Sequence, residues 1–209
     1  MVDLVICLKL PNDFEKYVIK AKKEISKKFK NVKFTEQPPH SILFLGNFKE
    51  KKLSQIEKEL INICNNTKSF YITFNGPKIL DDKINKSKGI VFIADNNINL
   101  RNFQKKIIET LNDYRNKEYI YDFIANALPR FSKKERINIK KYGYPYSWNN
   151  FIIHVSICSV SENFKNVFNY LKKYKNTFKF KVKGIVVYRL VQKKIFEIKW
   201  LKKIYNFKI

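Results

Sequence analysis

The chain has 209 residues, with 43 Lys and Arg against 18 Asp and Glu, which gives a formal net charge of +25. Hydrophobic residues make up 44% and aromatic residues 15% of the sequence, and these contents exclude a disordered polycation. No apolar run reaches the roughly 18 to 20 residues of a membrane span. The N-terminus runs directly into a strand-like segment without a secretory signal pattern. We therefore expect a cytoplasmic globular protein with no membrane partner, formed by a single domain over residues 1–209 and most simply a monomer.

The excess positive charge has two competing explanations. A basic surface attracts polyanions such as RNA, because it concentrates phosphate groups and speeds encounter. However, 38 of the 43 basic residues are lysines, and lysine, isoleucine and asparagine are all over-used, as expected from codon bias in an AT-rich genome. Solubility and compositional drift therefore compete with RNA binding as the cause of the charge.

Hydrophobic periodicity predicts an alternation of strands and helices in the first half of the chain. In chain order the predicted elements are a strand at 2–10, a helix from Asn12 to about Phe29, a strand at 41–48, a helix over about 53–63, strands at 70–74 and 89–94, and a helix over about 99–114. Residues 117–150 break this pattern. They are basic and tyrosine-rich, and we interpret them as an insertion with one short helix.

The second half then returns to regular patterning. We expect a strand at 151–160, a helix capped by Ser161, and a hairpin of two strands, 178–191 and 194–201, around Gln192 and Lys193. A strand–helix–strand unit thus occurs twice, each time with a histidine at a strand. The sequence therefore predicts an α+β fold of two pseudo-symmetric lobes, with antiparallel sheets facing a central cleft and helices outside.

Three cysteines are present, Cys7, Cys64 and Cys158, and they form no CxxC pair and no ligand cluster. Each lies in an apolar run, which is typical of a free cysteine that packs as a small buried hydrophobe. Their pattern favours a reducing compartment.

The only two histidines are the strongest candidates for chemistry. His40 opens an apolar run and His154 lies within another. Since successive strand residues point to opposite faces, His154, Ser156 and Cys158 share one face, as do His40, Ile42 and Phe44. A single histidine on an apolar strand is more often structural than catalytic. Two of them in equivalent places favour a pair of imidazoles across one cleft, which can act as a general acid and a general base near neutral pH.

Other kinds of site fit these residues less well. With two histidines, no ligand cluster of cysteines and no convincing carboxylate triad, we expect no metal site and no cofactor. In the acid–base interpretation Ser156, two residues after His154, supplies a hydrogen bond to a phosphoryl oxygen.

The segments around both histidines resemble the signature of the two-histidine (2H) phosphoesterases, a superfamily that includes RNA 2',5'-ligase and 2',3'-cyclic phosphodiesterase-like proteins. That signature is histidine, any residue, then serine or threonine, between hydrophobic residues and once per lobe. Residues 154–157 (His-Val-Ser-Ile) match it fully, residues 39–43 (Pro-His-Ser-Ile-Leu) are similar to its first copy, and residues 187–190 (Val-Tyr-Arg-Leu) look like the family's closing hairpin. The resemblance implies catalysis by His40, His154 and Ser156 on RNA 2',3'-cyclic phosphates or on 2',5'-linked or cyclic oligonucleotides.

The first copy of the motif departs from the family pattern. Ile42 stands where the family usually carries threonine or serine, and the nearest hydroxyl is that of Ser41. Strand alternation turns Ser41 away from the side of His40, although a bulge after Pro39 would turn it back. One phosphate-holding hydroxyl is therefore expected to be absent, or to be replaced by another residue.

The insertion and the C-terminal region supply further candidates for substrate binding. Aromatic side chains stack on bases and arginines contact phosphates, while packing and surface ion pairs are the competing interpretations. The candidates are Ser41, Arg130, Tyr142, Tyr144, Tyr146, Trp148, Tyr188 and Arg189. The leading functional hypothesis is a metal-independent phosphodiesterase. The alternatives are a catalytically weak or inactive RNA-binding protein on the same scaffold and a basic interaction protein with structural histidines.

Overall fold

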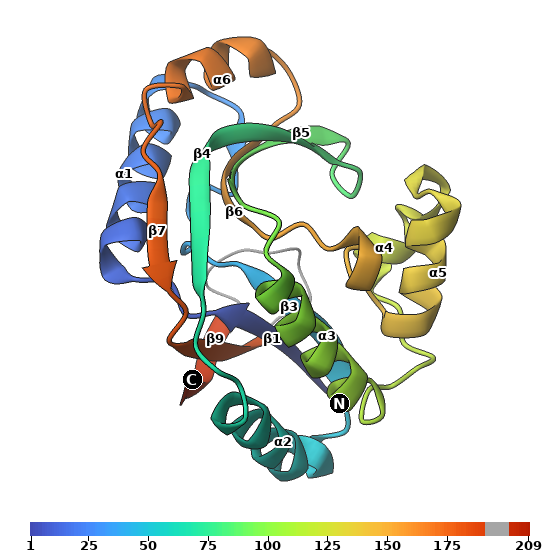
Figure 1. Ribbon diagram of the computed structural model, residues 1–209. Helices are drawn as coiled ribbons and strands as arrows, with labels where there is room; N and C mark the ends of the chain where they lie inside the picture. Colours follow the sequence, from blue (N-terminus) through green and yellow to red (C-terminus); the bar gives the residue numbers. More distant parts are fainter. Residues whose placement is uncertain (191–200) are drawn as a thin grey trace.

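The computed structural model describes residues 1–190 and 201–209, which form two antiparallel sheets surrounded by helices (Figure 1). The strands are β1 Val2–Leu8, β2 Val32–Lys33, β3 Ile42–Phe48, β4 Tyr71–Asp82, β5 Ser87–Ala94, β6 His154–Val160, β7 Phe178–Lys181, β8 Gly184–Leu190 and β9 Leu201–Lys208. The α-helices are α1 Asn12–Lys28, α2 Leu53–Asn65, α3 Ile98–Asn112, α4 Asp122–Ala125, α5 Lys133–Tyr142 and α6 Phe164–Leu171. Short 3-10 turns cover Glu50–Lys52, Leu128–Arg130 and Trp148–Asn150.

The two sheets have related strand orders. One sheet runs β3-β1-β8-β9 and the other runs β2-β6-β5-β4-β7, and every adjacent pair is antiparallel. When the two-residue strand β2 is set aside, each sheet has four described strands. The first strand in each order, β3 or β6, then lies at an edge, and it follows His40 or contains His154. The predicted α+β fold of two pseudo-symmetric lobes is therefore confirmed.

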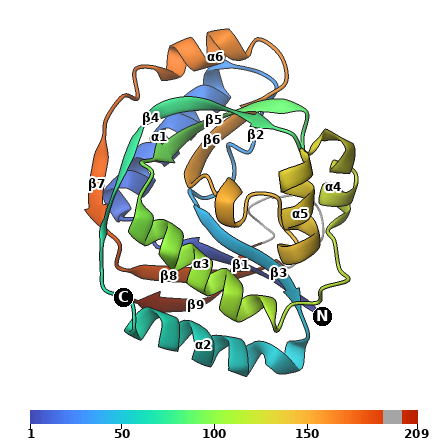
Figure 2. The same cartoon turned by 45° about the vertical axis from the view of Figure 1, so that its right-hand side comes forward.

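The lobes do not correspond to the two halves of the sequence. The first sheet joins the N-terminal strands to the C-terminal ones, whereas the second uses strands from the middle of the chain. Helix α1, which connects β1 to β3, packs on β6 of the other sheet, while α2 contacts β9 and α3 contacts β3. Figures 1 and 2 show α1 and α6 outside the curved five-stranded sheet and α2 and α3 beside the four-stranded one. The chain crosses between lobes, which a local pattern cannot reveal.

The insertion covers a face of the four-stranded sheet. Every residue of β1 is buried, because both faces of this strand are packed. Its even-numbered residues lie in the main core, whereas Val5 and Cys7 pack in a second cluster with Tyr121, Ile124 and Phe131 of the insertion. The segment that the sequence suggested to be irregular, with one short helix, contains α4 and α5, and it completes the packing of β1.

Strand β4 is longer than the sequence predicts. The predicted strand ends at Phe74, yet β4 continues to Asp82, with a break in its pairing with β5 between Asn75 and Lys78. Residues Gly76 and Pro77 occupy this irregularity, where a proline without an N–H is tolerated. A Cβ atom on Gly76 would lie 2.9 Å from the backbone of Lys175, so the close approach of the segment before β7 requires glycine here.

The C-terminal hairpin is described only in part. Strands β8 and β9 pair from Gly184 with Lys208 to Leu190 with Leu201. The predicted turn at Gln192 and Lys193, and most of the predicted strand 194–201, lie outside the described residues. Within the described ranges, no helix is long and apolar enough to cross a membrane. The three cysteines are free and buried, as predicted.

Candidate functional site

A cavity of about 320 Å³ lies where the two sheets and the insertion meet. The segment before β3 supplies Phe34, Gln37, His40 and Ile42, and the end of β4 with its turn supplies residues 80–85. The neighbouring strands and the insertion supply Gly89, Val91, Glu135, Tyr144, Tyr146, Ile152, His154, Ser156, Cys158 and Ser159. Both histidines, which are 114 positions apart in the sequence, thus border one space.

His40 is held by its own backbone. Its Nδ1 lies 2.8 Å from the carbonyl oxygen of Pro38, and a carbonyl can only accept, so Nδ1 carries the hydrogen and Nε2 of the neutral ring is left as the acceptor. Burial lowers the pKa of His40 to about 4, with smaller contributions in the same direction from Lys22 and His154 and an opposing one from the Pro38 carbonyl. His40 is therefore neutral at pH 7 and suited to accept a proton.

His154 repeats this arrangement on the other sheet. It opens β6, and its Nδ1 lies 3.0 Å from the carbonyl oxygen of Ile152, again two residues earlier. Burial lowers the pKa of His154, whereas the Ile152 carbonyl and the carboxylate of Asp82 act to raise it. The two rings thus have the same tautomer, fixed in the same way, and Nε2 is left as the acceptor of each.

The two strands present different neighbours to the cavity. Ser156 and Cys158 line it together with His154, as strand alternation predicts. Burial raises the pKa of Cys158 to about 12, so its thiol stays protonated near neutral pH. On the opposite wall Ile42 follows His40 and offers only an apolar surface. This side of the site therefore lacks the hydroxyl that Ser156 provides on the other.

The structure does not bring Ser41 or Phe44 to the cavity. Ser41 is fully buried and its hydroxyl has no hydrogen-bond partner among the described residues. The irregularity in β3 comes after Ile42, where Cys7 pairs with Ile42 and Ile6 pairs with Phe44, so Leu43 is the extra residue. This bulge moves Phe44 into the main core, and the expectation that Phe44 shares a face with His40 is wrong.

The aromatic residues of the insertion fall into two pairs. Tyr144 and Tyr146 line the cavity, with ring centroids 5.6 Å apart in an edge-to-face arrangement. Tyr142 stacks on Trp148 at 5.9 Å, and the ammonium of Lys105 lies 4.7 Å from the Trp148 ring centroid. This second pair is outside the cavity lining.

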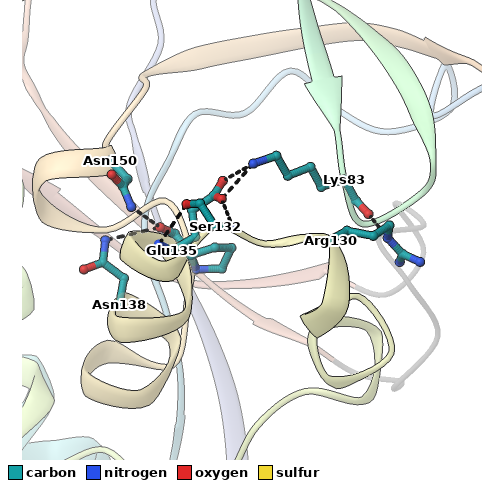
Figure 3. A network of polar contacts seen from close by, with 7 residues as sticks. Lys83, Arg130, Ser132, Glu135, Asn138 and Asn150 are labelled. Atoms are coloured by element: carbon teal, nitrogen blue, oxygen red, sulfur yellow. Dashed lines mark hydrogen bonds and ion pairs between the residues drawn. The ribbon is translucent and has the colours of Figure 1, made fainter.

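The candidate arginines make contacts within the protein. Arg130 donates through Nε to the backbone carbonyl of Lys83 (Figure 3). It also donates through Nη2 to the carbonyl of Ile84 at 3.0 Å. Arg189 forms an ion pair with Glu50 at 3.1 Å. Neither arginine lines the cavity, and the same holds for Tyr188, which packs on the second cluster.

Figure 3 shows how the insertion is attached to the β4–β5 turn. Lys83 donates to both carboxylate oxygens of Glu135, at 2.9 and 2.7 Å. Glu135 also accepts from the Ser132 backbone N–H, and the Ser132 hydroxyl accepts from the Glu135 N–H, which forms a capping box at the start of α5. This network sets the position of the segment that carries Tyr144 and Tyr146.

Sequence reasoning missed most of the polar residues at or beneath the site, and three of them bear on its chemistry. Asp82 lines the cavity and accepts from the Asn85 backbone N–H at 3.1 Å and the Asn85 amide at 2.7 Å. Gln37 also lines the cavity. Lys22 on α1 is 2% exposed and donates to the Phe34 carbonyl at 2.8 Å. Only Lys22 carried a signal, since its spacing from Val18 and Ile25 places it on the apolar stripe of its helix.

The described residues contain no group of three or more His, Cys, Asp or Glu side chains arranged to hold a metal ion. The cavity lining includes two imidazoles, a hydroxyl two residues after one of them, and two phenol rings.

The chain has an α+β fold of two antiparallel sheets like that of the 2H phosphoesterases, and this fold is shared with solved structures. TT0787 of Thermus thermophilus superposes with a TM-score of 0.57 at 13% identity, over 100% of this chain and 97% of that chain. E. coli LigT complexed with NADP+ gives a TM-score of 0.54 at 8% identity, and LigT complexed with phosphate gives 0.50 at 9% identity, each covering 100% of this chain and 97% of LigT. At these identities the similarity establishes the fold.

Comparison of the amino-acid sequence with known families and curated proteins finds no related protein. No protein-family model matches the chain, and a search among curated proteins finds no significant similarity.

Proposed function

We propose that the protein is a metal-independent phosphodiesterase that uses His40 and His154 as an acid–base pair. One observation carries the proposal: both histidines line one cavity, and each Nδ1 donates to the carbonyl two residues before it. This arrangement leaves one Nε2 on each side for a substrate between the sheets. A correctly placed acid or base contributes on the order of 10² to 10⁴ in rate.

The reaction requires one neutral and one protonated imidazole. In hydrolysis of a 2',3'-cyclic phosphate, the neutral ring takes a proton from water as the water oxygen bonds to phosphorus. The protonated ring gives its proton to the ribose oxygen as the P–O bond breaks, and a phosphomonoester and a free hydroxyl result. For a 2',5' linkage the neighbouring ribose hydroxyl takes the place of water. Ser156 donates to a phosphoryl oxygen.

The surroundings of the two rings differ and favour one assignment. Lys22 and the His154 ring contribute to the lowered pKa of His40, whereas Asp82 acts to raise the pKa of His154. A single proton shared by the pair is therefore more stable on His154. We assign His154 as the general acid and His40 as the general base in the hydrolytic direction.

The substrate class follows from the cavity and its aromatic edge. Tyr144 and Tyr146 can stack on a base while the imidazoles contact the phosphodiester. LigT, which has the same fold, was crystallised with NADP+ and with phosphate. We therefore propose RNA 2',3'-cyclic phosphates and 2',5'-linked or cyclic oligonucleotides as substrates.

The test is turnover of these substrates in EDTA by the wild type, His40→Ala and His154→Ala. We expect each variant to lose at least about 100-fold in kcat/KM while keeping the wild-type circular dichroism spectrum and Tm. A diester with a p-nitrophenolate leaving group does not require a general acid, so His154→Ala should retain far more activity on it than His40→Ala. Wild-type rates in both folded variants would refute the proposal.

A non-catalytic RNA-binding protein is the second candidate, and Ile42 favours it, because this residue leaves one wall of the cavity without a hydroxyl. It predicts tight, salt-sensitive RNA binding and no turnover of any substrate in the panel.

A further inference from the structure

Gln37 has a polar group that the protein itself does not satisfy. It lies between β2 and β3, three residues before His40, and lines the cavity with both histidines. Its side chain is 6% exposed, and its amide nitrogen Nε2 is buried without a hydrogen-bond partner among the described residues. Buried donors are nearly always paired in native proteins, so an unpaired one on a cavity wall points to a ligand that supplies the acceptor.

A second buried glutamine shows the usual arrangement. Gln104 on α3 is 2% exposed, and its Nε2 donates to the carbonyl of Leu43 at 3.0 Å. That carbonyl belongs to the extra residue of the β3 bulge, so Gln104 satisfies a backbone group that lost its regular partner. Gln104 has a structural partner, and Gln37 has none among the described residues.

The backbone beneath Gln37 is fixed before any ligand arrives. The Gln37 N–H donates to the Phe34 carbonyl at 3.4 Å, and the ammonium of Lys22 donates to the same oxygen at 2.8 Å. Phe34 adopts a φ of 65°, a left-handed conformation that a non-glycine residue keeps only where its surroundings enforce it. The hydrogen bond from Lys22 thus stabilises this tight turn and fixes the backbone position of Gln37.

The position of this donor matches what the site lacks. On the wall that carries His154, Ser156 offers a hydroxyl two residues after the histidine. On the wall that carries His40, the residue two positions later is Ile42, which offers none. We propose that Gln37 is a substrate-contacting residue whose Nε2 donates a hydrogen bond to a non-bridging phosphoryl oxygen, taking the place of the hydroxyl missing at position 42. The inference rests on the proposed phosphodiesterase function and names a further residue of that site.

Binding is tested first, with inorganic phosphate and with a 2',3'-cyclic nucleotide monophosphate as probes. The side-chain amide signals of Gln37 are assigned in a ¹⁵N-labelled protein by their loss in Gln37→Leu. We expect both probes to shift these signals in the wild type, and Gln37→Leu to bind each probe about 10-fold or more weakly. Gln55→Leu, an exposed substitution on α2, is the matched control and should bind as the wild type does.

Catalysis and stability give two further readouts. We expect Gln37→Leu to lower kcat/KM about 10- to 100-fold, and Ile42→Thr to recover about 10-fold when added to Gln37→Leu. Because Gln37→Leu removes an unpaired donor, it should leave Tm unchanged or raise it. Gln104→Leu leaves the Leu43 carbonyl without its hydrogen-bond donor and should lower Tm. A merely structural Gln37 would show the opposite stability order and no rescue by threonine.

The outcomes separate this inference from the proposed function. Unshifted Gln37 amide signals with either probe, or full kcat/KM in Gln37→Leu when the wild type is active, overturn the inference alone. Shifted signals and weakened binding in a wild-type protein that turns over no substrate support the phosphoryl contact and refute the phosphodiesterase.

Discussion

A histidine pair with lowered pKa values predicts an acidic pH optimum. In the proposed mechanism, kcat/KM requires His40 neutral and His154 protonated in the free protein. The pKa of His40 is about 4, and that of His154 lies below its ordinary value of 6.5. We therefore expect kcat/KM to be maximal between about 4 and 6.5 and to fall as pH rises further, because His154 then loses its proton. A profile that still rises from pH 7 to 8 would contradict the assignment.

Replacement of Lys22 by methionine sharpens this test. Lys22 is buried, and among the described residues its ammonium donates to a backbone carbonyl rather than to a carboxylate. Its positive charge helps to lower the pKa of His40. Lys22→Met should therefore move the acidic limb of the profile to higher pH, since His40 then accepts a proton more readily. The variant loses the hydrogen bond to the Phe34 carbonyl but should remain folded, because a buried charge is replaced by an apolar side chain of similar length.

Residue roles were predictable where the pattern was local. Strand alternation placed His154, Ser156 and Cys158 on one face, and all three line the cavity. The same rule failed for Phe44, because the bulge at Leu43 depends on pairing with β1, which is distant in sequence. Nothing in the sequence near Gln37 indicated an unpaired amide, since burial of that group results from the meeting of both sheets.

At the scale of elements, periodicity predicted the helices outside the insertion and most strands to within a few residues. The predicted single strand 178–191 is wrong, because it is two strands, β7 and β8, in different sheets. Helix α1 begins at Asn12, and α2 and α3 match the predicted apolar spacing. The insertion was expected to hold one short helix but has two, α4 and α5. Both are short and draw their stability from packing on Val5 and Cys7 of β1 rather than from an apolar stripe of their own. Its attachment to the β4–β5 turn by Lys83 and Glu135 joins residues 52 positions apart.

This attachment predicts the effect of changing Glu135. Glu135→Gln removes the ion pair with Lys83 and weakens the capping box of α5, a cap usually worth about 1 kcal/mol. We expect faster amide hydrogen exchange in α5 and a raised KM, because Tyr144 and Tyr146 follow this helix into the cavity. Glu109→Gln, at an exposed position on α3, is the control. Unchanged exchange in α5 would show that the ion pair does not hold the insertion in place.

At the scale of the whole molecule, the charge of +25 is not gathered in the cavity. Among the described residues that line it, Asp81, Asp82 and Glu135 are acidic and Lys83 alone is basic. Three of these groups form ion pairs within the protein, since Lys83 pairs with Glu135 and Asp81 pairs with Lys88. The positive field therefore arises mainly from lysines outside the cavity, such as Lys16, Lys20, Lys23 and Lys27, which border a shallow groove along α1.

This distribution predicts that salt dependence scales with substrate length. A mononucleotide 2',3'-cyclic phosphate reaches only the cavity, so its kcat/KM should change by less than about 3-fold between about 50 and 200 mM salt, because few counterions are released. An oligonucleotide ending in the same group also extends over the protein surface, and each phosphate that contacts a lysine there makes the slope of log kcat/KM against log salt steeper by about 0.7. Steady-state kinetics with the two substrates in parallel salt series measures the difference. Equal slopes would mean that the lysine surface takes no part in substrate capture, and the excess charge would then reflect composition alone.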